Sequence, residues 1–136
     1  MRSSVTTLVD TSAFLALLNG LDLSHDAAVG WWSAALEADE PMLTTSYVLI
    51  ETTSLAQARL GTEAVRVLHD GFLGVVPVQW TDRKDHDEAV THVVASGRRS
   101  LSVVDRMSFL IMRRFGVERA FAFDPHFREE GFELVP

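Results

Sequence analysis

Short apolar runs alternate with helical patterns along the chain, and this alternation restricts the fold more than any other feature. The apolar runs predict strands at 5–9, 41–44, 75–79, 120–123 and 132–135. Segments with helical periodicity fill most intervals, at 11–19, 24–38, 46–59, 62–72, 81–96 and 105–115, with Ser46 and Thr81 as predicted N-caps. Strands separated by helices predict βαβ units, and therefore a mainly parallel sheet of four to five strands inside a three-layer α/β/α sandwich.

The composition fits one domain, predicted to span residues 1–136. The hydrophobic fraction of 47% is sufficient for a single core. No apolar stretch approaches the roughly 20 residues of a transmembrane helix. Cysteine is absent, which excludes a disulfide framework and a thiolate metal site. Together these features predict a cytoplasmic protein.

The net charge counts against binding to nucleic acid, whereas the distribution of the arginines is compatible with it. A net charge of −7 is unusual for a nucleic-acid binder, which is more often basic. Nine of the 12 Lys and Arg nevertheless lie within residues 83–128, and all but Lys84 are arginines, which suit bidentate phosphate contact. Solvated helix faces explain the same residues without a ligand. A bound cation would also offset part of the acidic total.

Four acidic residues stand at the ends of apolar runs or inside helical segments. Asp10 and Asp124 directly follow predicted strands. If these strands are parallel neighbours, both carboxylates emerge at the sheet edge where ligands gather in open α/β folds. Glu51 lies in the apolar helical segment VLIETTSLA, so it is expected to be partly buried and to need a partner. Asp105 falls in the first turn of a helix or at its N-cap.

Each acid also has an explanation that requires no ligand. Capping or turn formation accounts for Asp10, Asp105 and Asp124 taken singly. An ion pair with Arg59 accounts for Glu51. If the acids instead share one small site, their repulsion raises their pKa values unless a cation is present. Carboxylate oxygens suit Mg²⁺ or Mn²⁺. One or two such ions activate water and stabilise a phosphoryl transition state, which predicts a phosphodiester hydrolase.

Polar side chains next to the acids are candidates for supporting roles. Thr11 and Ser12, at the start of the first predicted helix, offer hydroxyl and backbone donors to a phosphate. Ser102 precedes Asp105 by three residues and is placed to orient its carboxylate. The histidines show no zinc spacing. Among them His126 is the one near an acid, and it is predicted to be a turn residue.

Three segments resemble PIN-domain proteins and, more narrowly, VapC toxins, the ribonuclease halves of VapB–VapC toxin–antitoxin modules. They are LVDTSAFLALL, TSYVLIETTSLAQARLG and LSVVDRMSFLIMRRFGVERAFAFDPHFREEGFELVP. The resemblance covers the full length, keeps the order of the motifs and is most specific in the final segment. It implies a Mg²⁺- or Mn²⁺-dependent endoribonuclease that cuts structured RNA, commonly in tRNA or ribosomal RNA loops, and so inhibits translation.

The resemblance also implies roles for individual residues. The metal-binding and catalytic acids of the family match Asp10, Glu51, Asp105 and Asp124. Hydroxyl groups that support the ligands or bind phosphate match Thr11, Ser12 and Ser102. Relatives commonly form homodimers and are suppressed by an antitoxin that covers the acidic groove. RNA, a VapB-like antitoxin and a second copy of the chain are therefore the implied partners.

Other functions stay open from the sequence. PIN-domain nucleases also process RNA outside toxin–antitoxin modules. Phosphatase and receiver domains place aspartates at strand ends too, but the D-x-D pattern and the late-strand lysine that they require are missing. A non-catalytic acidic module that binds a basic partner or a structural ion would have the same sequence. Arg106, directly after Asp105, is expected either to face the RNA backbone or to form a salt bridge with Asp105.

Overall fold

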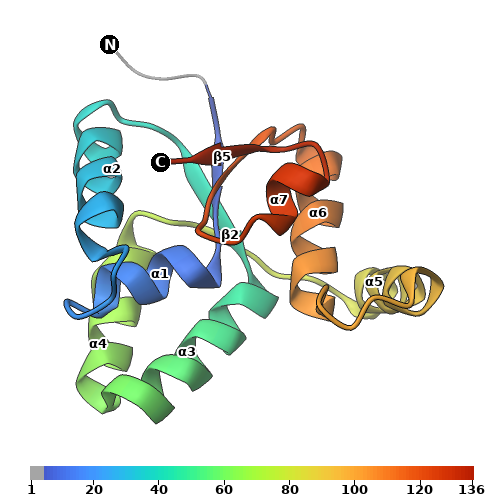
Figure 1. Cartoon of the computed structure of the whole chain (residues 1–136), viewed down its shortest axis with the longest axis horizontal. Coiled ribbons are helices and arrows are strands. Elements are labelled where there is room, and N and C mark those ends of the chain that lie inside the picture. The colour runs from blue at the N-terminus through green and yellow to red at the C-terminus, as the bar shows by residue number, and fades with distance from the viewer. Residues whose placement is uncertain (1–4) are drawn as a thin grey trace.

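A central parallel sheet organises the residues that the computed structural model describes, 5–136. Its five strands lie in the order β3-β2-β1-β4-β5 (Figure 1). Their bounds are β1 (Thr7–Val9), β2 (Met42–Thr45), β3 (Val78–Gln79), β4 (Arg119–Phe121) and β5 (Glu133–Val135). All four neighbouring pairs are parallel, and β3 is an edge strand. The predicted fold class is therefore confirmed.

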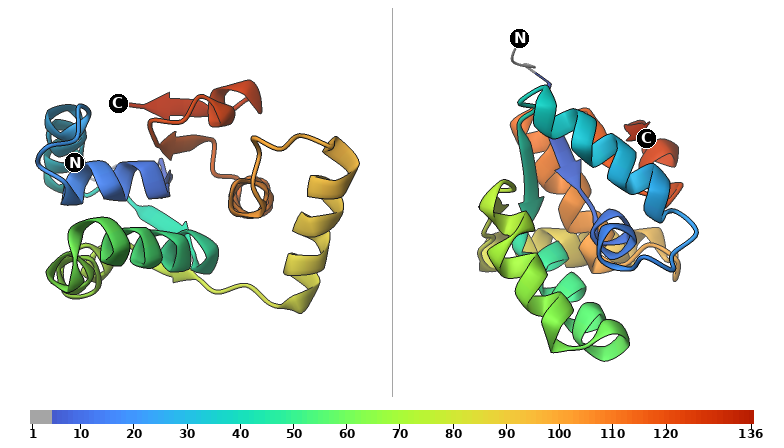
Figure 2. Two further views of the ribbon diagram at one scale, coloured as in Figure 1. Left: turned by 60° about the horizontal axis from the view of Figure 1, so that its bottom comes forward. Right: turned by 90° about the vertical axis from the view of Figure 1, so that its left-hand side faces the viewer.

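Helices cover both faces of the sheet (Figures 1 and 2). The first group comprises α1 (Thr11–Leu18), α2 (His25–Glu37), α3 (Ser46–Leu60), α4 (Thr62–Asp70) and a 3-10 turn η1 (Phe72–Gly74). The second group comprises α5 (Arg83–Ser96), α6 (Val103–Phe115) and α7 (His126–Glu129). No helix within residues 5–136 combines the length and the apolar character needed to cross a membrane.

The core is split by the sheet into two main apolar layers. Successive residues of a strand point to opposite faces, so Val9 joins the layer that packs against α1 and α2, whereas Leu8 joins the layer beneath α6 and α7. β4 repeats the pattern with Phe121 on the first face and Ala120 on the second. Because helices cover both faces, all three residues of β1 are buried, as expected for a parallel sheet between two layers of helices.

The order of the strands creates a switch point beside β1. The chain moves from β1 outward through β2 and β3, then returns to place β4 on the other side of β1. The Asp10 backbone N–H donates to the carbonyl of Phe121 over 3.0 Å, which continues the β1–β4 pairing beyond the strands. Asp10 and Asp124 therefore leave the sheet at the same edge, as predicted, and this edge is where open α/β folds bind ligands.

Several predicted boundaries are wrong by a few residues. The N-cap of α3 is Thr45 rather than Ser46, because the extended backbone of Thr45 lets its hydroxyl accept from Val48 N–H over 3.1 Å. Ser46 instead contacts the hydroxyl of Thr81 at 3.0 Å. The N-cap of α5 is Asp82 rather than Thr81, since its carboxylate closes a capping box.

Two further differences concern short elements. The third strand covers only Val78–Gln79, because Val75 and Val76 turn back to donate to the carbonyl of Phe72, and Pro77 follows them. The short helix α7 was not predicted, since one helical turn gives too little periodicity to recognise. In addition, α6 begins at Val103, two residues before the predicted start.

The aromatic cluster beneath α6 is expected to be a main source of stability. Phe109 is 1% exposed, and its ring centroid lies 5.3 Å from that of Phe127 and 5.7 Å from that of Phe132. Phe109→Ala is predicted to lower the free energy of unfolding by about 3–5 kcal/mol, because it removes transfer energy and leaves a cavity. Phe115→Ala, on the same helix at a residue 52% exposed, should cost about 1 kcal/mol or less. Urea unfolding measures both, and equal losses would contradict the assignment of the core.

Candidate active site

A pocket of about 310 Å³ opens at the carboxyl edge of the sheet. The starts of α1 and α6 meet there, together with α3 and the segment after β4. Leu15 and Ser100 form part of its wall. The rest is formed by the four predicted acids and the three predicted hydroxyl residues: Asp10, Glu51, Asp105 and Asp124, with Thr11, Ser12 and Ser102. The structure thus gathers residues that are up to 114 positions apart in the sequence (Asp10 to Asp124) around one hollow.

Asp10 is held at the pocket by hydrogen bonds from Ser12. It is 4% exposed and caps α1, and its Oδ2 accepts from Ser12 N–H at 3.2 Å and from the Ser12 hydroxyl at 2.7 Å. The same hydroxyl accepts from Phe123 N–H at 2.9 Å. Because its one proton is directed to Asp10, the Ser12 hydroxyl orients the carboxylate rather than donating to a phosphate.

Glu51 faces the pocket from α3 without an ionic partner. It is partly buried, as predicted, but forms no ion pair with Arg59 within residues 5–136. The neighbouring Thr52 is buried and donates from its hydroxyl to the Thr11 hydroxyl over 3.2 Å. This bond fixes α3 against the start of α1. The Thr11 hydroxyl is therefore also engaged inside the fold.

Asp105 combines a helix cap with a place in the pocket. Its Oδ2 accepts from Ser102 N–H at 3.1 Å, and its own N–H donates to the Ser102 hydroxyl at 3.2 Å. These reciprocal bonds form the capping box that starts α6. Only 13% of the Asp105 side chain is exposed. Capping therefore explains the local conformation, as the alternative interpretation expected, but the carboxylate still borders the pocket.

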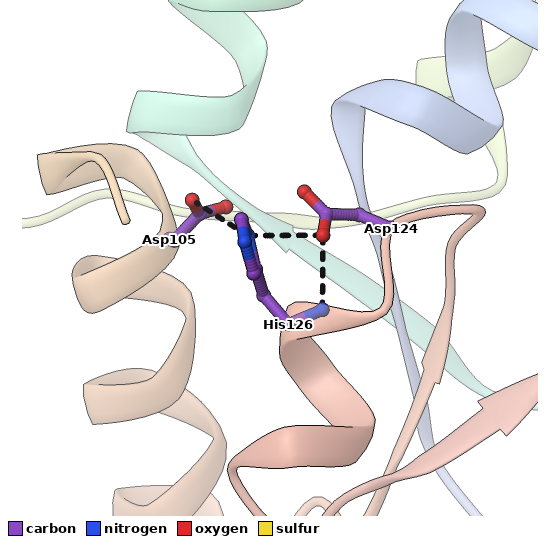
Figure 3. A group of neighbouring side chains, drawn as sticks. All are labelled: Asp105, Asp124 and His126. Carbon is purple, nitrogen blue, oxygen red and sulfur yellow. Dashed lines mark hydrogen bonds and ion pairs between the residues drawn. The ribbon is translucent and has the colours of Figure 1, made fainter. Parts of the chain in front are cut away.

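His126 joins Asp105 and Asp124 in a tight group (Figure 3). Its Nδ1 lies 2.9 Å from Asp124 Oδ1 and 3.8 Å from Asp105 Oδ2. One ligand atom from each residue lies within 4.8 Å of the other two, which is close enough for one ion. Asp10 and Glu51 line the pocket but are not members of this group. The sequence prediction treated His126 as a turn residue, and the only signal for more was its position two residues after Asp124.

Burial and neighbouring charge disfavour negative charge on Asp10 and Asp105. Burial raises the pKa of Asp10 from 3.8 to about 6; the hydrogen bonds from Ser12 oppose this shift, and the charge of Asp105 adds to it. Burial likewise raises the pKa of Asp105, and the charge of Asp124 contributes in the same direction. Hydrogen bonds from Ser102 and the proximity of His126 lower the pKa of Asp105 but do not cancel the rise. A divalent cation would relieve this repulsion, so the donor set fits such an ion.

Arg106 forms an ion pair with Glu130 rather than the salt bridge expected with Asp105. Its Nη1 lies 3.5 Å from Glu130 Oε1, and its guanidinium carbon lies 5.9 Å from the centre of the Phe109 ring. Its side chain is 13% exposed. It forms no ion pair with Asp105 within the described chain, and its burial leaves little of it available to RNA. Arg106 therefore fastens α6 to the segment after α7.

Comparisons with known proteins agree with this architecture. The PIN domain family matches residues 7–133. The chain is 34% identical over 128 residues to the 23S rRNA-specific endonuclease VapC20 of Mycobacterium tuberculosis (strain H37Rv), covering 93% of this chain and 95% of that protein. The crystal structure of M. tuberculosis VapC20, described as a Sarcin-Ricin loop cleaving toxin, superimposes with a TM-score of 0.82 at 33% identity, covering 96% and 99% of the two chains.

More distant structures share the fold alone. VapBC2 from Rickettsia felis, bound to a promoter DNA fragment, gives a TM-score of 0.69 at 13% identity and covers 96% of this chain and 97% of its own. DNA-bound VapBC from Salmonella typhimurium gives 0.66 at 14% identity, with 96% of each chain covered.

The parallel sheet and the acid-lined pocket at its switch point, taken with these comparisons, identify an endonuclease domain. The chain belongs to the PIN-domain family and, within it, to the VapC endonucleases. The predicted resemblance is therefore confirmed, and the phosphatase and receiver alternatives are set aside. That residues 1–136 form a single PIN domain stays a prediction.

Asp10→Asn is predicted to stabilise the metal-free protein at neutral pH. Folded Asp10 keeps its proton up to about pH 6, whereas the unfolded chain releases it near 3.8, so the wild type loses stability as the pH rises between these values. The variant lacks this cost and should gain about 1–3 kcal/mol at pH 7. Urea unfolding in EDTA measures the difference.

The pH dependence supplies the control for this prediction. The advantage of Asp10→Asn should shrink as the pH falls from about 6 towards 4, because folded wild-type Asp10 then takes up its proton and no longer buries a charge. Asp70→Asn, at an exposed position on α4, should show no comparable trend. A variant less stable than the wild type at pH 7 in EDTA would show that the buried charge carries no such cost.

Proposed function

We propose that this protein is a Mg²⁺- or Mn²⁺-dependent endoribonuclease, the toxin of a type II toxin–antitoxin module, and that it acts on ribosomal RNA in the cytoplasm. The observation that carries the proposal is the convergence of Asp10, Glu51, Asp105 and Asp124 on one pocket. Identity of 34% to a 23S rRNA-specific endonuclease over nearly the whole chain supports the same activity.

The four acids would hold the metal, and the hydroxyl residues would orient them. Ser12 fixes Asp10 and Ser102 fixes Asp105 by the hydrogen bonds described above. When bound, divalent ions supply Lewis acidity that activates water and stabilises charge developing on the phosphate. The caps at the starts of α1 and α6 hold the carboxylates of Asp10 and Asp105 in fixed positions, so that their charge is already placed for the ion.

The proposed substrate is the sarcin–ricin loop of 23S rRNA, by analogy with VapC20. A loop suits this site because sequence-specific recognition of RNA generally requires unpaired bases. Arg99 is proposed as the basic group that meets the RNA backbone, because it directly precedes Ser100, which lines the pocket. Arg98 is paired with Glu129 at 3.4 Å, whereas Arg99 is exposed and has no ion pair within residues 5–136.

The proposed partners follow from the surface charge and the relatives. A net charge of −7 suits a basic segment of a VapB-like antitoxin, which would compete with RNA for the acidic pocket. VapBC complexes among the structural neighbours support this pairing. A homodimer is the proposed assembly of the toxin itself.

Asp10→Asn and Asp105→Asn are each predicted to reduce cleavage of a sarcin–ricin loop RNA by on the order of a thousandfold or more, because each removes a metal ligand. Both variants keep an oxygen for their local hydrogen bonds, so circular dichroism should show a retained fold. Sequencing of the product ends should find 5′-phosphate and 3′-hydroxyl groups in the wild type. Asp70→Asn, on the exposed surface of α4, is the control with unchanged activity.

Two results would contradict the proposed mechanism. Cleavage that persists at the wild-type rate in EDTA would exclude a metal requirement. Products that carry 2′,3′-cyclic phosphates would indicate attack by the RNA 2′-hydroxyl rather than by water. A tRNA and an unrelated hairpin, assayed in parallel, would show whether the ribosomal loop is the preferred target.

Arg99→Ala is predicted to weaken RNA binding without altering the metal site. Loss of one phosphate contact should lower the salt dependence of log K by about one, uniformly across RNA sequences. Fluorescence anisotropy with the Asp10→Asn protein, which does not cut the RNA, measures this slope. Arg59→Ala removes an exposed arginine two helical turns beyond Glu51 and should leave the slope unchanged. Equal slopes for the two variants would show that Arg99 contacts no phosphate.

A further inference from the structure

We propose that His126 is itself a metal ligand, so that one ion is bound by the His126 imidazole nitrogen together with the carboxylates of Asp105 and Asp124. The inference rests on the proposed metal dependence and adds a nitrogen donor to a site otherwise composed of oxygen. His126 lies outside the four acids that the sequence identifies.

The distances match those between ligands of a common ion. Two donor atoms about 2.1 Å from one ion and at right angles to each other lie about 3.0 Å apart. His126 Nδ1 and Asp124 Oδ1 are 2.9 Å apart, which fits such an adjacent pair. Asp105 Oδ2, 3.8 Å from the same nitrogen, fits a wider angle around the same centre. Figure 3 shows the imidazole between the two carboxylates.

The nitrogen lacks a hydrogen-bond partner within the described chain. His126 Nδ1 is buried, yet its approach to Asp124 does not have the geometry of a hydrogen bond. A buried ring nitrogen normally has a partner, since leaving it unsatisfied costs free energy. An ion shared with Asp105 and Asp124 would supply the missing interaction.

The fold fixes the position of the imidazole. The backbone N–H of His126 donates to Asp124 Oδ1 at 2.9 Å, which ties the start of α7 to the carboxylate. The next residue, Phe127, is fully buried and packs edge-on against Phe109 of α6. Because α7 is anchored at His126 and Phe127, the His126 imidazole lies next to Asp105 at the start of α6. Orientation of this kind is what a metal ligand requires.

A nitrogen donor changes the selectivity of the site. Mg²⁺ prefers oxygen ligands, whereas later divalent ions of the first transition row accept imidazole more readily. The site should therefore favour Mn²⁺ over Mg²⁺ more strongly than four carboxylates alone would. The competing interpretation is that His126 acts only as a positive counter-charge to the two acids, with no bond to the ion.

The test is pulsed electron paramagnetic resonance of Mn²⁺ bound to the full-length protein. Direct coordination predicts a ¹⁴N coupling from a bound imidazole in the wild type, which is lost in His126→Ala and in His126→Asn and is retained in His92→Ala, a change at an exposed histidine of α5. Isothermal titration should show Mn²⁺ binding weakened by on the order of tenfold or more in the two His126 variants, with a smaller change for Mg²⁺. The asparagine variant keeps a polar side chain at this position, so it tests the loss of the imidazole even if the alanine variant misfolds.

The outcomes separate this inference from the proposed function. Mn²⁺ binding and RNA cleavage by the wild type without a ¹⁴N coupling would overturn the role of His126 and leave the nuclease proposal intact. A coupling that survives in both His126 variants would do the same. If the wild type binds neither Mn²⁺ nor Mg²⁺, both proposals fail. Loss of the coupling in the two His126 variants alone would establish His126 as the ligand.

Discussion

The parallel pairing of β1 with β4 is the interaction on which the site depends. It places two segments more than a hundred residues apart side by side, in register from Thr7 opposite Arg119 to Val9 opposite Phe121. Asp10 continues this pairing through its backbone, so the end of β1 is fixed relative to the segment that carries Asp124. A slip of one residue would reverse the facing of every side chain in a strand buried on both sides. Packing on both faces of the sheet therefore fixes the register of β1 and β4, and with it the positions of the residues that follow these strands at the pocket.

The buried acids of the pocket lower the stability of the fold, and the same acids are suited to binding a cation. Burial and mutual repulsion disfavour ionised Asp10 and Asp105, and the fold compensates with hydrogen bonds from the Ser12 hydroxyl and the Ser102 backbone N–H. Such strain is characteristic of functional sites, because a cation that binds there removes the repulsion and gains affinity from it. The same reasoning suggests how an overall acidic protein acts on a polyanion: a divalent ion held by these acids would offset the negative charge that RNA meets at the pocket.

Much of this arrangement was predictable from the sequence, for identifiable reasons. The apolar runs predicted the sheet because buried parallel strands need continuous apolar residues, and the strand-end positions of Asp10 and Asp124 predicted a shared edge. The gathering of Glu51 and Asp105 into the same pocket required the crossing of α3 and α6, which periodicity does not encode. His126 was missed because α7 is a single turn, and the direction of its ring depends on packing of Phe127 against a helix distant in sequence. N-caps were misplaced where two neighbouring polar residues both qualified.

The capping box of α6 makes one carboxylate responsible for two tasks. Asp105 both borders the pocket and satisfies the backbone N–H of Ser102 at the start of a helix whose inner face supplies Met107, Phe109, Ile111 and Met112 to the core. Asp105→Ala would remove the carboxylate from the pocket and also loosen the start of α6, whereas Asp105→Asn removes the charge and keeps an oxygen for the capping bond. Under selection against the nuclease, well-folded inactive alleles at Asp105 should therefore be those that keep the capping oxygen, and such alleles would still bind a partner that recognises the folded surface.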